Sequence, residues 1–246
     1  GTSVKGKSAT EVANMLKSDS VKTSTIVVKR NDKELTFKVT KENITLFSVS
    51  SEMLDNNGKN VGYLSVSIFG QKTYSQFKDA LTKLEKQDMD SLIIDLRGNT
   101  GGYLSTVTNM LEEFIDKGNV IYQIQSSSGV KQYKTVKASE KKYKIVVLID
   151  GGSASASEIM SAAMKEVYGA TLVGQTTYGK GTVQTTKNLS NGSMIKYTIE
   201  KWLTPSGKNI DKEGIKPDCE VELGDSYKNP TKENDAQLQK ALDLLK

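Results

Sequence analysis

The sequence predicts an α/β domain, because strand-like and helical segments alternate along most of its length. Residues 145–149, Ile-Val-Val-Leu-Ile, form an unbroken apolar run, as expected of a strand buried on both faces of a sheet. Residues 71–87 predict a helix, because apolar side chains recur there at helical spacing: Tyr74, Phe77, Leu81 and Leu84. The length of 246 residues allows one large domain, or one domain with a small module.

Residues 1–43 are expected to form a small unit of one helix and one hairpin. Ser8-Ala-Thr-Glu11 matches a capping box and predicts the start of the helix. Two strand-like segments, residues 23–29 and 34–40, follow and are joined by a short turn. Because a short helix and a single hairpin bury little core alone, we expect the unit to be completed by the next domain or by sequence outside this chain.

Residues 44–246 are expected to form the main domain. Its strand-like segments lie at residues 44–70, 91–95, 119–125, 145–149, 170–174 and 192–203. Besides residues 71–87, helices are expected at residues 104–116 and 235–244 and directly after a serine-rich turn at residues 153–157. Residues 126–143 are polar and lysine-rich, which predicts a surface hairpin, and the loop at residues 175–184 runs into another strand.

The composition excludes several kinds of site. There is no histidine, which rules out Ser-His and Cys-His catalytic pairs and histidine metal sites. Cys219 is the single cysteine, so neither an internal disulfide nor a thiolate metal cluster can form. The net charge of +5 comes almost entirely from lysine, whereas base recognition in nucleic acids relies on arginine. We therefore expect no metal, no cofactor and no nucleic-acid partner. No apolar run approaches the ~20 residues needed to span a membrane.

The turn after residues 145–149 is the first candidate for chemistry. Gly151 and Gly152 allow a sharp turn, and Ser153, Ser155 and Ser157 follow where a helix begins. A serine at this position has its hydroxyl beside free backbone N–H groups, which suits a nucleophile with an oxyanion hole. The alternative is purely structural, because Ser-x-x-Glu from residue 155 to residue 158 is also a capping box.

A glycine-rich turn follows the predicted strand at residues 91–95. Its pattern, Gly98-x-x-Gly101-Gly102, matches neither common phosphate-binding motif, which makes a phosphate site a weak hypothesis. A tight strand-to-helix turn explains the glycines structurally. A third use is as half of an oxyanion hole, with a glycine N–H directed at the reacting group.

Lys180 is the candidate base, since histidine is absent and lysine is the other common partner of a nucleophilic serine. The glycines on each side of Lys180 predict either a flexible loop or a backbone packed closely enough to bury the amine. To act near neutral pH, a lysine pKa must fall from ~10.4 toward 7–8, which costs about 4 kcal/mol and requires desolvation. Gln184 could hydrogen-bond the amine without adding charge.

Four motifs, in their order along the chain, resemble those of the carboxyl-terminal processing peptidases, also called tail-specific proteases. They begin at Asp95-Leu-Arg-Gly-Asn-Thr-Gly-Gly, Gly152-Ser-Ala-Ser-Ala-Ser-Glu-Ile, Tyr178-Gly-Lys-Gly-Thr-Val-Gln and Thr204-Pro-Ser-Gly. The resemblance implies a Clp-protease/crotonase-like core of mixed sheet and helices.

The same resemblance assigns the site residues. It implies that Ser155, which lies 25 residues before Lys180, is the nucleophile, with Lys180 the base and Gln184 the residue that orients the lysine. The oxyanion hole maps onto the N–H of Ala156 and of one glycine in the Gly101-Gly102 pair, and both glycines stay open as candidates. Where some members carry a functional aspartate, this sequence has Glu166, which is not assigned to catalysis.

The first 43 residues resemble the second half of a PDZ domain. The loop of a PDZ domain that binds a terminal carboxylate belongs to the first half, which this sequence does not contain. Gly1-Thr2-Ser3 does not look like a natural beginning, and no signal peptide opens the sequence, so we expect a piece of a longer protein. An incomplete PDZ segment is expected to bind substrate tails poorly.

The sequence predicts a serine endopeptidase that uses Ser155 and Lys180 to cleave proteins near their C-termini through an acyl-enzyme. The resemblance implies a protein or peptide substrate with an apolar C-terminal tail. It also implies an extracytoplasmic bacterial location, in the periplasm, at the cell surface or secreted, and leaves a homo-oligomer open. Two alternatives remain at this stage: a catalytically silent PDZ-linked scaffold, and a crotonase-like acyl-CoA enzyme that needs only the glycine turn.

Overall fold

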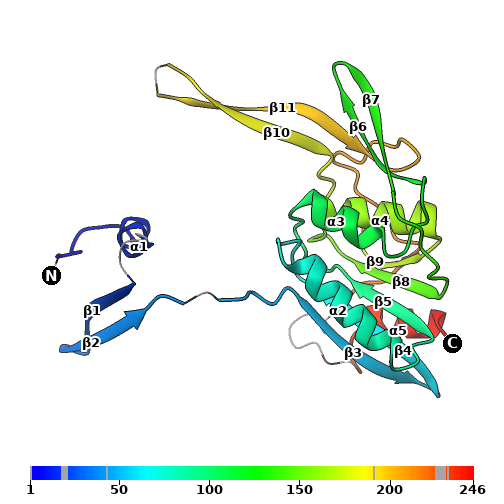
Figure 1. The fold of residues 1–246 in the computed structure, drawn as a ribbon, viewed down its shortest axis with the longest axis horizontal. Coiled ribbons are helices and arrows are strands. Elements are labelled where there is room, and N and C mark those ends of the chain that lie inside the picture. The colour runs from blue at the N-terminus through cyan, green and yellow to red at the C-terminus, as the bar shows by residue number, and fades with distance from the viewer. Residues whose placement is uncertain (1, 18–21, 43, 191, 225–230, 232) are drawn as a thin grey trace. The chain divides into compact units, whose positions relative to one another are not determined.

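The computed structural model describes residues 2–17, 22–42, 44–190, 192–224, 231 and 233–246. The chain divides into two compact units, Gly1–Leu46 and Phe47–Lys246, which are drawn in Figure 1. The domain boundary expected after residue 43 falls at a residue outside those described. Each unit is considered by itself.

The first unit contains the expected helix and hairpin, α1 (Ala9–Lys17), β1 (Thr23–Arg30) and β2 (Lys33–Thr40). The capping box is confirmed, because the Glu11 carboxylate accepts the Ser8 N–H at 2.8 Å. The two strands pair antiparallel, with Ile26 opposite Phe37. None of the described residues of this unit is fully buried, so it has the thin core that a helix and one hairpin predict. The PDZ-like identity of the unit stays a prediction.

A six-stranded sheet forms the centre of the second unit, in the order β12-β9-β8-β5-β4-β3. Its strands are β3 (Val49–Asn56), β4 (Lys59–Val66), β5 (Ser91–Asp95), β8 (Lys144–Ile149), β9 (Thr171–Gly174) and β12 (Cys219–Glu220). All neighbours pair in parallel except β3, which runs antiparallel to β4. All five residues of β5 are buried, which explains why strands of this sheet read as apolar runs.

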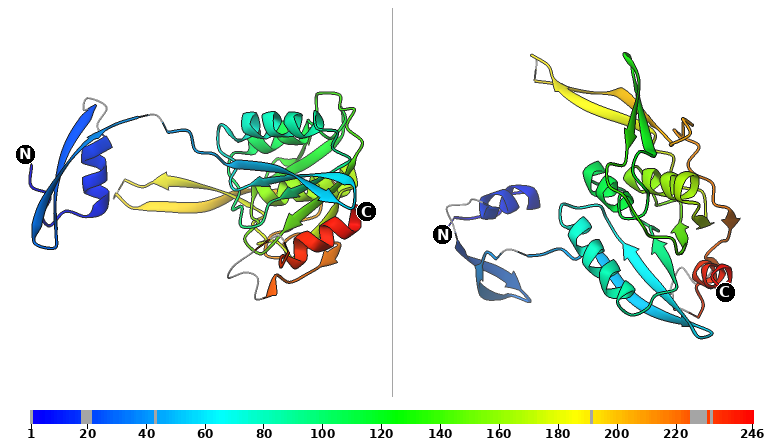
Figure 2. Two further views of the ribbon diagram at one scale, coloured as in Figure 1. Left: turned by 90° about the horizontal axis from the view of Figure 1, so that it is seen from below. Right: turned by 45° about the vertical axis from the view of Figure 1, so that its right-hand side comes forward.

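Helices cover both faces of this sheet, as Figure 2 shows for α2 and α5. The helices are α2 (Thr73–Glu85), α3 (Leu104–Leu111), α4 (Ala156–Ala163) and α5 (Ala236–Leu244). Side chains of β5 alternate between the two cores: Leu92 and Ile94 pack with α2, α3 and α4, whereas Ile93 packs with α5. The α/β class predicted from the sequence is therefore confirmed.

A second, antiparallel sheet has the order β10-β11-β6-β7. Its strands are β6 (Val120–Ser126), β7 (Gly129–Lys134), β10 (Thr182–Asn188) and β11 (Met194–Leu203). Much of the β10–β11 hairpin is exposed, and Figure 1 shows it extending from the rest of its unit. Among the described residues of this hairpin, 182–190 and 192–203, only Trp202 and Leu203 at the end of β11 are buried.

Two helices end in irregular turns, and the first of them ends earlier than the sequence predicts. The expected helix at residues 104–116 stops at Leu111, because the following amides bond to carbonyls three residues back, as Phe114 does to Leu111. Helix α4 stops at Ala163 and continues as one π-helical turn, η1 (Met164–Tyr168), which Gly169 ends with a φ of +85°. Such turns are rare and often mark functional regions.

Candidate active site

All three candidate motifs follow neighbouring parallel strands. The glycine-rich turn comes after β5, the serine turn after β8 and the Lys180 loop after β9, and these strands are adjacent in the sheet. The carboxyl ends of parallel strands lie at one edge, which is where α/β proteins bind ligands. The fold therefore places the three motifs at the same edge of the sheet.

Ser155 lies on a sharp turn between β8 and α4, with φ +56° and ψ −114°. A positive φ is uncommon for a residue other than glycine, and holding it costs about 1–3 kcal/mol. A serine on a strained strand-to-helix turn is the arrangement that exposes a nucleophile in other hydrolases. The backbone at Ser155 is thus consistent with the functional interpretation of this turn.

The three serines of the turn differ in their surroundings. Ser153 and Ser157 are completely buried, and their hydroxyls donate to the carbonyls of Leu96 (2.8 Å) and Asn99 (2.7 Å). Ser155 is partly exposed, and within the described part of the chain its hydroxyl donates to no protein group. Ser155 is therefore the serine with a hydroxyl available for chemistry.

A buried carboxylate connects the serine turn to the Lys180 loop. Glu158 is completely buried, and its Oε2 accepts the N–H of Ser155 at 2.8 Å and the N–H of Lys180 at 2.9 Å. Its Oε1 accepts the N–H of Gly179 and the hydroxyl of Thr177, each at 2.7 Å. The backbones of the two candidate catalytic residues are thus held against one oxygen atom.

The capping interpretation of Ser155 and Glu158 is also confirmed, since the glutamate accepts the N–H at the start of α4. The sequence pattern predicted this local contact but not the bonds to the Lys180 loop. Those bonds join residues more than twenty positions apart, and only the adjacency of β8 and β9 brings them together.

The loop around Lys180 needs both of its glycines. A Cβ on Gly181 would lie 2.7 Å from the Asp211 nitrogen, and Gly179 has a φ of +84° with backbone atoms of residues 212–214 at 3.0 Å. The close backbone packing that the sequence suggested is therefore present. The burial of the amine that was expected with this packing is absent, because the Lys180 residue is exposed. Among the described residues, its amine and the Ser155 hydroxyl form no hydrogen bond with each other.

The glycine-rich turn lies directly against the serine turn. A Cβ on Gly101 would lie 3.0 Å from the Ser155 Cβ and 3.1 Å from the Ala156 nitrogen, whereas one on Gly102 would enter the carbonyl of Phe69 at 2.3 Å. Asn99 joins the two turns, because its carbonyl accepts the Ala154 N–H at 3.0 Å.

The two candidate glycine N–H groups differ in their bonding. The N–H of Gly101 donates to the Asn99 side chain at 2.9 Å. The N–H groups of Gly102 and Ala156 have no acceptor among the protein groups that the structure describes. Gly101 therefore provides the close contact with Ser155, and Gly102 provides an N–H that is available to a ligand.

Two further residues lie outside this contact network. Gln184 is exposed on β10, beside a bulge at Val183 and Gln184, and its side chain forms no hydrogen bond with the described residues. Glu166 lies in the π-helical turn, and its carboxylate accepts the Ser206 N–H at 2.8 Å. That bond connects η1 to the turn at Thr204–Gly207.

In the described ranges, no group of three or more His, Cys, Asp or Glu residues is placed to hold a metal ion. Of the helices in those ranges, none combines the length and apolar character needed to cross a membrane.

The sequence matches Peptidase family S41 across residues 60–221. It is 38% identical over 235 residues to the carboxy-terminal processing protease CtpA of Bacillus subtilis, covering 94% of this chain and 49% of CtpA. It is 40% identical over 196 residues to CtpB of the same organism, covering 79% of this chain and 41% of CtpB. The chain thus spans about half the length of these relatives.

The fold is similar to the solved structure of the photosystem II D1 C-terminal processing protease. The two align with a TM-score of 0.66 and 29% sequence identity, over 90% of this chain and 61% of the other. A putative S41 protease from Bacteroides fragilis has a TM-score of 0.64 at 15% identity, over 90% of this chain and 65% of the other, which supports the fold alone.

Proposed function

The chain belongs to peptidase family S41, and from this we propose that it is the protease part of a carboxyl-terminal processing serine peptidase with Ser155 as nucleophile and Lys180 as general base. The observation that carries the proposal is the Glu158 oxygen that accepts the N–H groups of both residues. Family membership favours peptide hydrolysis over the chemistry of a crotonase-like acyl-CoA enzyme.

The proposed reaction begins when the neutral Lys180 amine takes the proton of the Ser155 hydroxyl. The Ser155 oxygen attacks a peptide carbonyl carbon, and a negative charge forms on the carbonyl oxygen. This oxygen accepts hydrogen bonds from the N–H groups of Ala156 and Gly102. The C–N bond then breaks, the departing amine takes the proton from Lys180, and the acyl group stays on Ser155. Lys180 then takes a proton from a water molecule, whose oxygen attacks the acyl carbon. The ester bond to the Ser155 oxygen breaks, Lys180 returns the proton to that oxygen, and the product leaves with a new carboxyl group.

The proposed reaction also depends on Gln184 and on the bound substrate itself. In the proposal, Gln184 accepts a hydrogen bond from the Lys180 amine and orients it. The exposed Lys180 side chain must turn toward Ser155 and lose its water before it can act as a base near neutral pH. Substrate bound over the loop would exclude this water, so we propose that the dyad is completed when a polypeptide occupies the site.

Substrate and location follow from the family. The relatives CtpA and CtpB are carboxy-terminal processing proteases, so we propose a protein substrate cleaved near an apolar C-terminal tail. We also propose an extracytoplasmic location and leave the assembly state to experiment. Size-exclusion chromatography with light scattering would measure whether the chain forms a homo-oligomer.

The direct test is cleavage of an unstructured polypeptide with an apolar C-terminus. Ser155→Ala and Lys180→Ala should each lower the rate at least about 100-fold, whereas Lys187→Ala, at an exposed lysine on β10, should leave it unchanged. Undiminished cleavage by both dyad variants would contradict the assignment.

If the 246-residue chain cleaves nothing, the same variants should be compared in a longer chain with a complete PDZ module. Cleavage there that depends on Ser155 and Lys180 would support the proposal. Continued absence of activity would favour the silent scaffold.

A further inference from the structure

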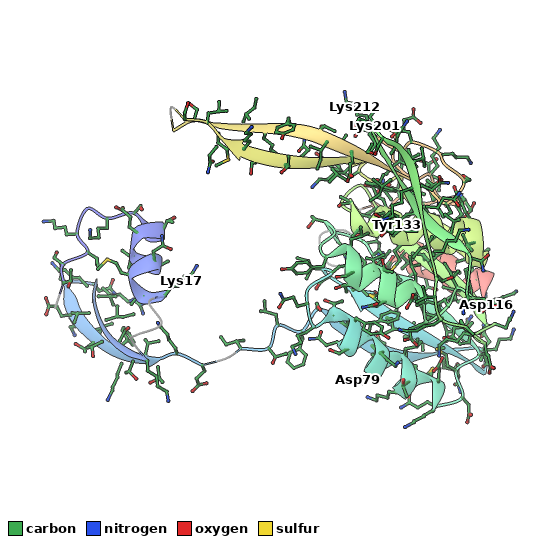
Figure 3. All side chains as sticks on the ribbon, turned by 45° about the horizontal axis from the view of Figure 1, so that its top comes forward. Lys17, Asp79, Asp116, Tyr133, Lys201 and Lys212 are labelled. Atoms are coloured by element: carbon green, nitrogen blue, oxygen red, sulfur yellow. The ribbon has the colours of Figure 1, made fainter. Side chains whose placement is uncertain are left out.

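Trp202, the single tryptophan of the chain, contacts the loop that carries the proposed base. It lies at the buried end of β11, next to Lys201, which Figure 3 labels, and only 4% of its surface is exposed. Its indole N–H donates to the Lys180 carbonyl at 2.6 Å, and its backbone N–H donates to the Gly181 carbonyl at 3.0 Å. Two consecutive carbonyls of the Gly-Lys-Gly segment are therefore held by one residue.

The Lys180 residue is consequently fixed from both sides. Its N–H donates to Glu158, which belongs to α4, and its carbonyl accepts from Trp202, which belongs to β11. Lys180 lies between two glycines, whose backbones could otherwise adopt many conformations. With both peptide groups bonded, the direction of the Lys180 Cα–Cβ bond is set, although its side chain is exposed.

We propose that Trp202 is a positioning residue for Lys180: its indole N–H holds the backbone of the base so that the lysine side chain starts in the direction of Ser155. The inference rests on the proposed function of Lys180. Trp202 acts through the Lys180 carbonyl and has no assigned contact with substrate.

The competing interpretation is that Trp202 only fills the core, where it packs in the larger of the two clusters. Both roles would make a large truncation harmful, so the test must remove the N–H and keep the ring. If Trp202 only fills the core, activity should fall in proportion to the fraction of the protein that is folded. A positioning role predicts a lower kcat with an unchanged KM, because substrate contacts stay intact while the base is displaced.

The first experiment compares Trp202→Phe with the wild-type chain, and uses Tyr197→Phe, an exposed aromatic position on the same strand, as the matched control. Trp202→Phe should lower kcat about five-fold, the loss that corresponds to ~1 kcal/mol for one hydrogen bond, with KM within about two-fold. Tyr197→Phe should change none of these values.

A second measurement does not depend on activity. Competitive labelling with an amine-reactive reagent, read by mass spectrometry, should change at Lys180 by at least about two-fold in Trp202→Phe and stay constant at Lys187. If Trp202→Phe does not fold, benzothienylalanine at position 202 replaces the N–H with sulfur and keeps the ring shape.

The outcomes separate the two proposals. A folded chain without the indole N–H that keeps wild-type kcat and wild-type Lys180 labelling would overturn the positioning role. A loss of activity that only matches the loss of folded protein would also overturn the positioning role. If Ser155→Ala and Lys180→Ala cleave like wild type, the dyad fails, and the labelling of Lys180 alone then decides whether Trp202 holds it.

Discussion

Glu158 shows how a single buried residue can hold together two turns that carry the proposed catalytic residues. Its carboxylate is completely buried and, among the described residues, pairs with no cation. Four donors surround it instead: three backbone N–H groups and one hydroxyl. Charge-assisted bonds of this kind are worth about 1.5–3 kcal/mol each, which is enough to keep a buried anion in place.

Glu158→Gln should therefore be far more damaging than its similar shape suggests. The glutamine amide would turn an N–H₂ group toward at least one backbone N–H, and the loop with Lys180 would lose part of its attachment to the serine turn. We expect a loss of about 2–4 kcal/mol in the free energy of unfolding, measured with denaturant, and at least a ten-fold loss of kcat. Glu213→Gln, at an exposed glutamate of a nearby loop, is the control and should change neither.

Gly101 and Gly98 provide a matched pair of glycine substitutions. Both have a positive φ, but a Cβ on Gly101 would meet the Ala154 carbonyl at 2.9 Å and Ser155 at 3.0 Å, whereas one on Gly98 would meet nothing within 4 Å. Gly98→Ala should thus cost only backbone strain, roughly 1–2 kcal/mol, and keep most activity. Gly101→Ala should displace the serine turn and lower kcat at least about 100-fold. Equal effects of the two changes on kcat would argue against the contact.

At the scale of elements, half-buried tyrosines join the π-helical turn to the sheet. The Tyr168 hydroxyl, on η1, donates to the Tyr143 carbonyl, just before β8, at 2.6 Å. Burial raises the pKa of Tyr168 to about 12, above the usual value of 10.0. Burial is also the largest cause that raises the pKa values of Tyr63 and Tyr143.

These shifts predict that the fold weakens at alkaline pH. Above pH 10 the unfolded chain loses its tyrosine protons while folded Tyr168 keeps its own until about pH 12, so stability is complete below pH 10 and falls as pH rises toward 12. Melting temperatures at pH 8 and at pH 11 would measure the fall. Tyr168→Phe should start lower at pH 8, because it loses one hydrogen bond, and should then fall less than wild type. An identical fall in both proteins would contradict the role of Tyr168.

Sequence patterns predicted these elements well where the signal was local. Apolar spacing located α2, and the Ser-x-x-Glu pattern located the starts of α1 and α4. The end of α3 and the π-helical turn were missed, because they depend on packing rather than on glycine or proline signals. Glu158 and Trp202 were missed as organisers of the Lys180 loop for a related reason: their partners are 19 to 22 residues away and come together only in the folded sheet.

For the molecule as a whole, the α/β class was recognisable from the alternation of strand-like and helical segments, and the family from four motifs. What the motifs could not supply is the side-chain state of the dyad, because an exposed lysine has several rotamers that a sequence does not distinguish. The identities of Ser155, Lys180, Gln184 and the oxyanion donors stay predictions until the variants are assayed.

The two units should differ strongly in local stability. No described residue of Gly1–Leu46 is fully buried, whereas every residue of β5 in the second unit is. Amide hydrogen exchange should therefore be fast in β1 and β2 and slowest in β5 and β8, with a difference of at least about 100-fold in rate. Comparable amide protection in the two units would contradict this prediction.

The shared oxygen of Glu158 has a consequence for how quickly such a site can respond. The backbones of Ser155 and Lys180 are already fixed against it. In the proposed mechanism, the movement that remains to complete the dyad is rotation about the lysine side-chain bonds. Exposed side chains change rotamer in picoseconds to nanoseconds, whereas loop and domain rearrangements take microseconds or longer. In the proposed enzyme, the delay before the first cut would then be set by the arrival of the polypeptide that displaces water, and hardly at all by the protease unit itself.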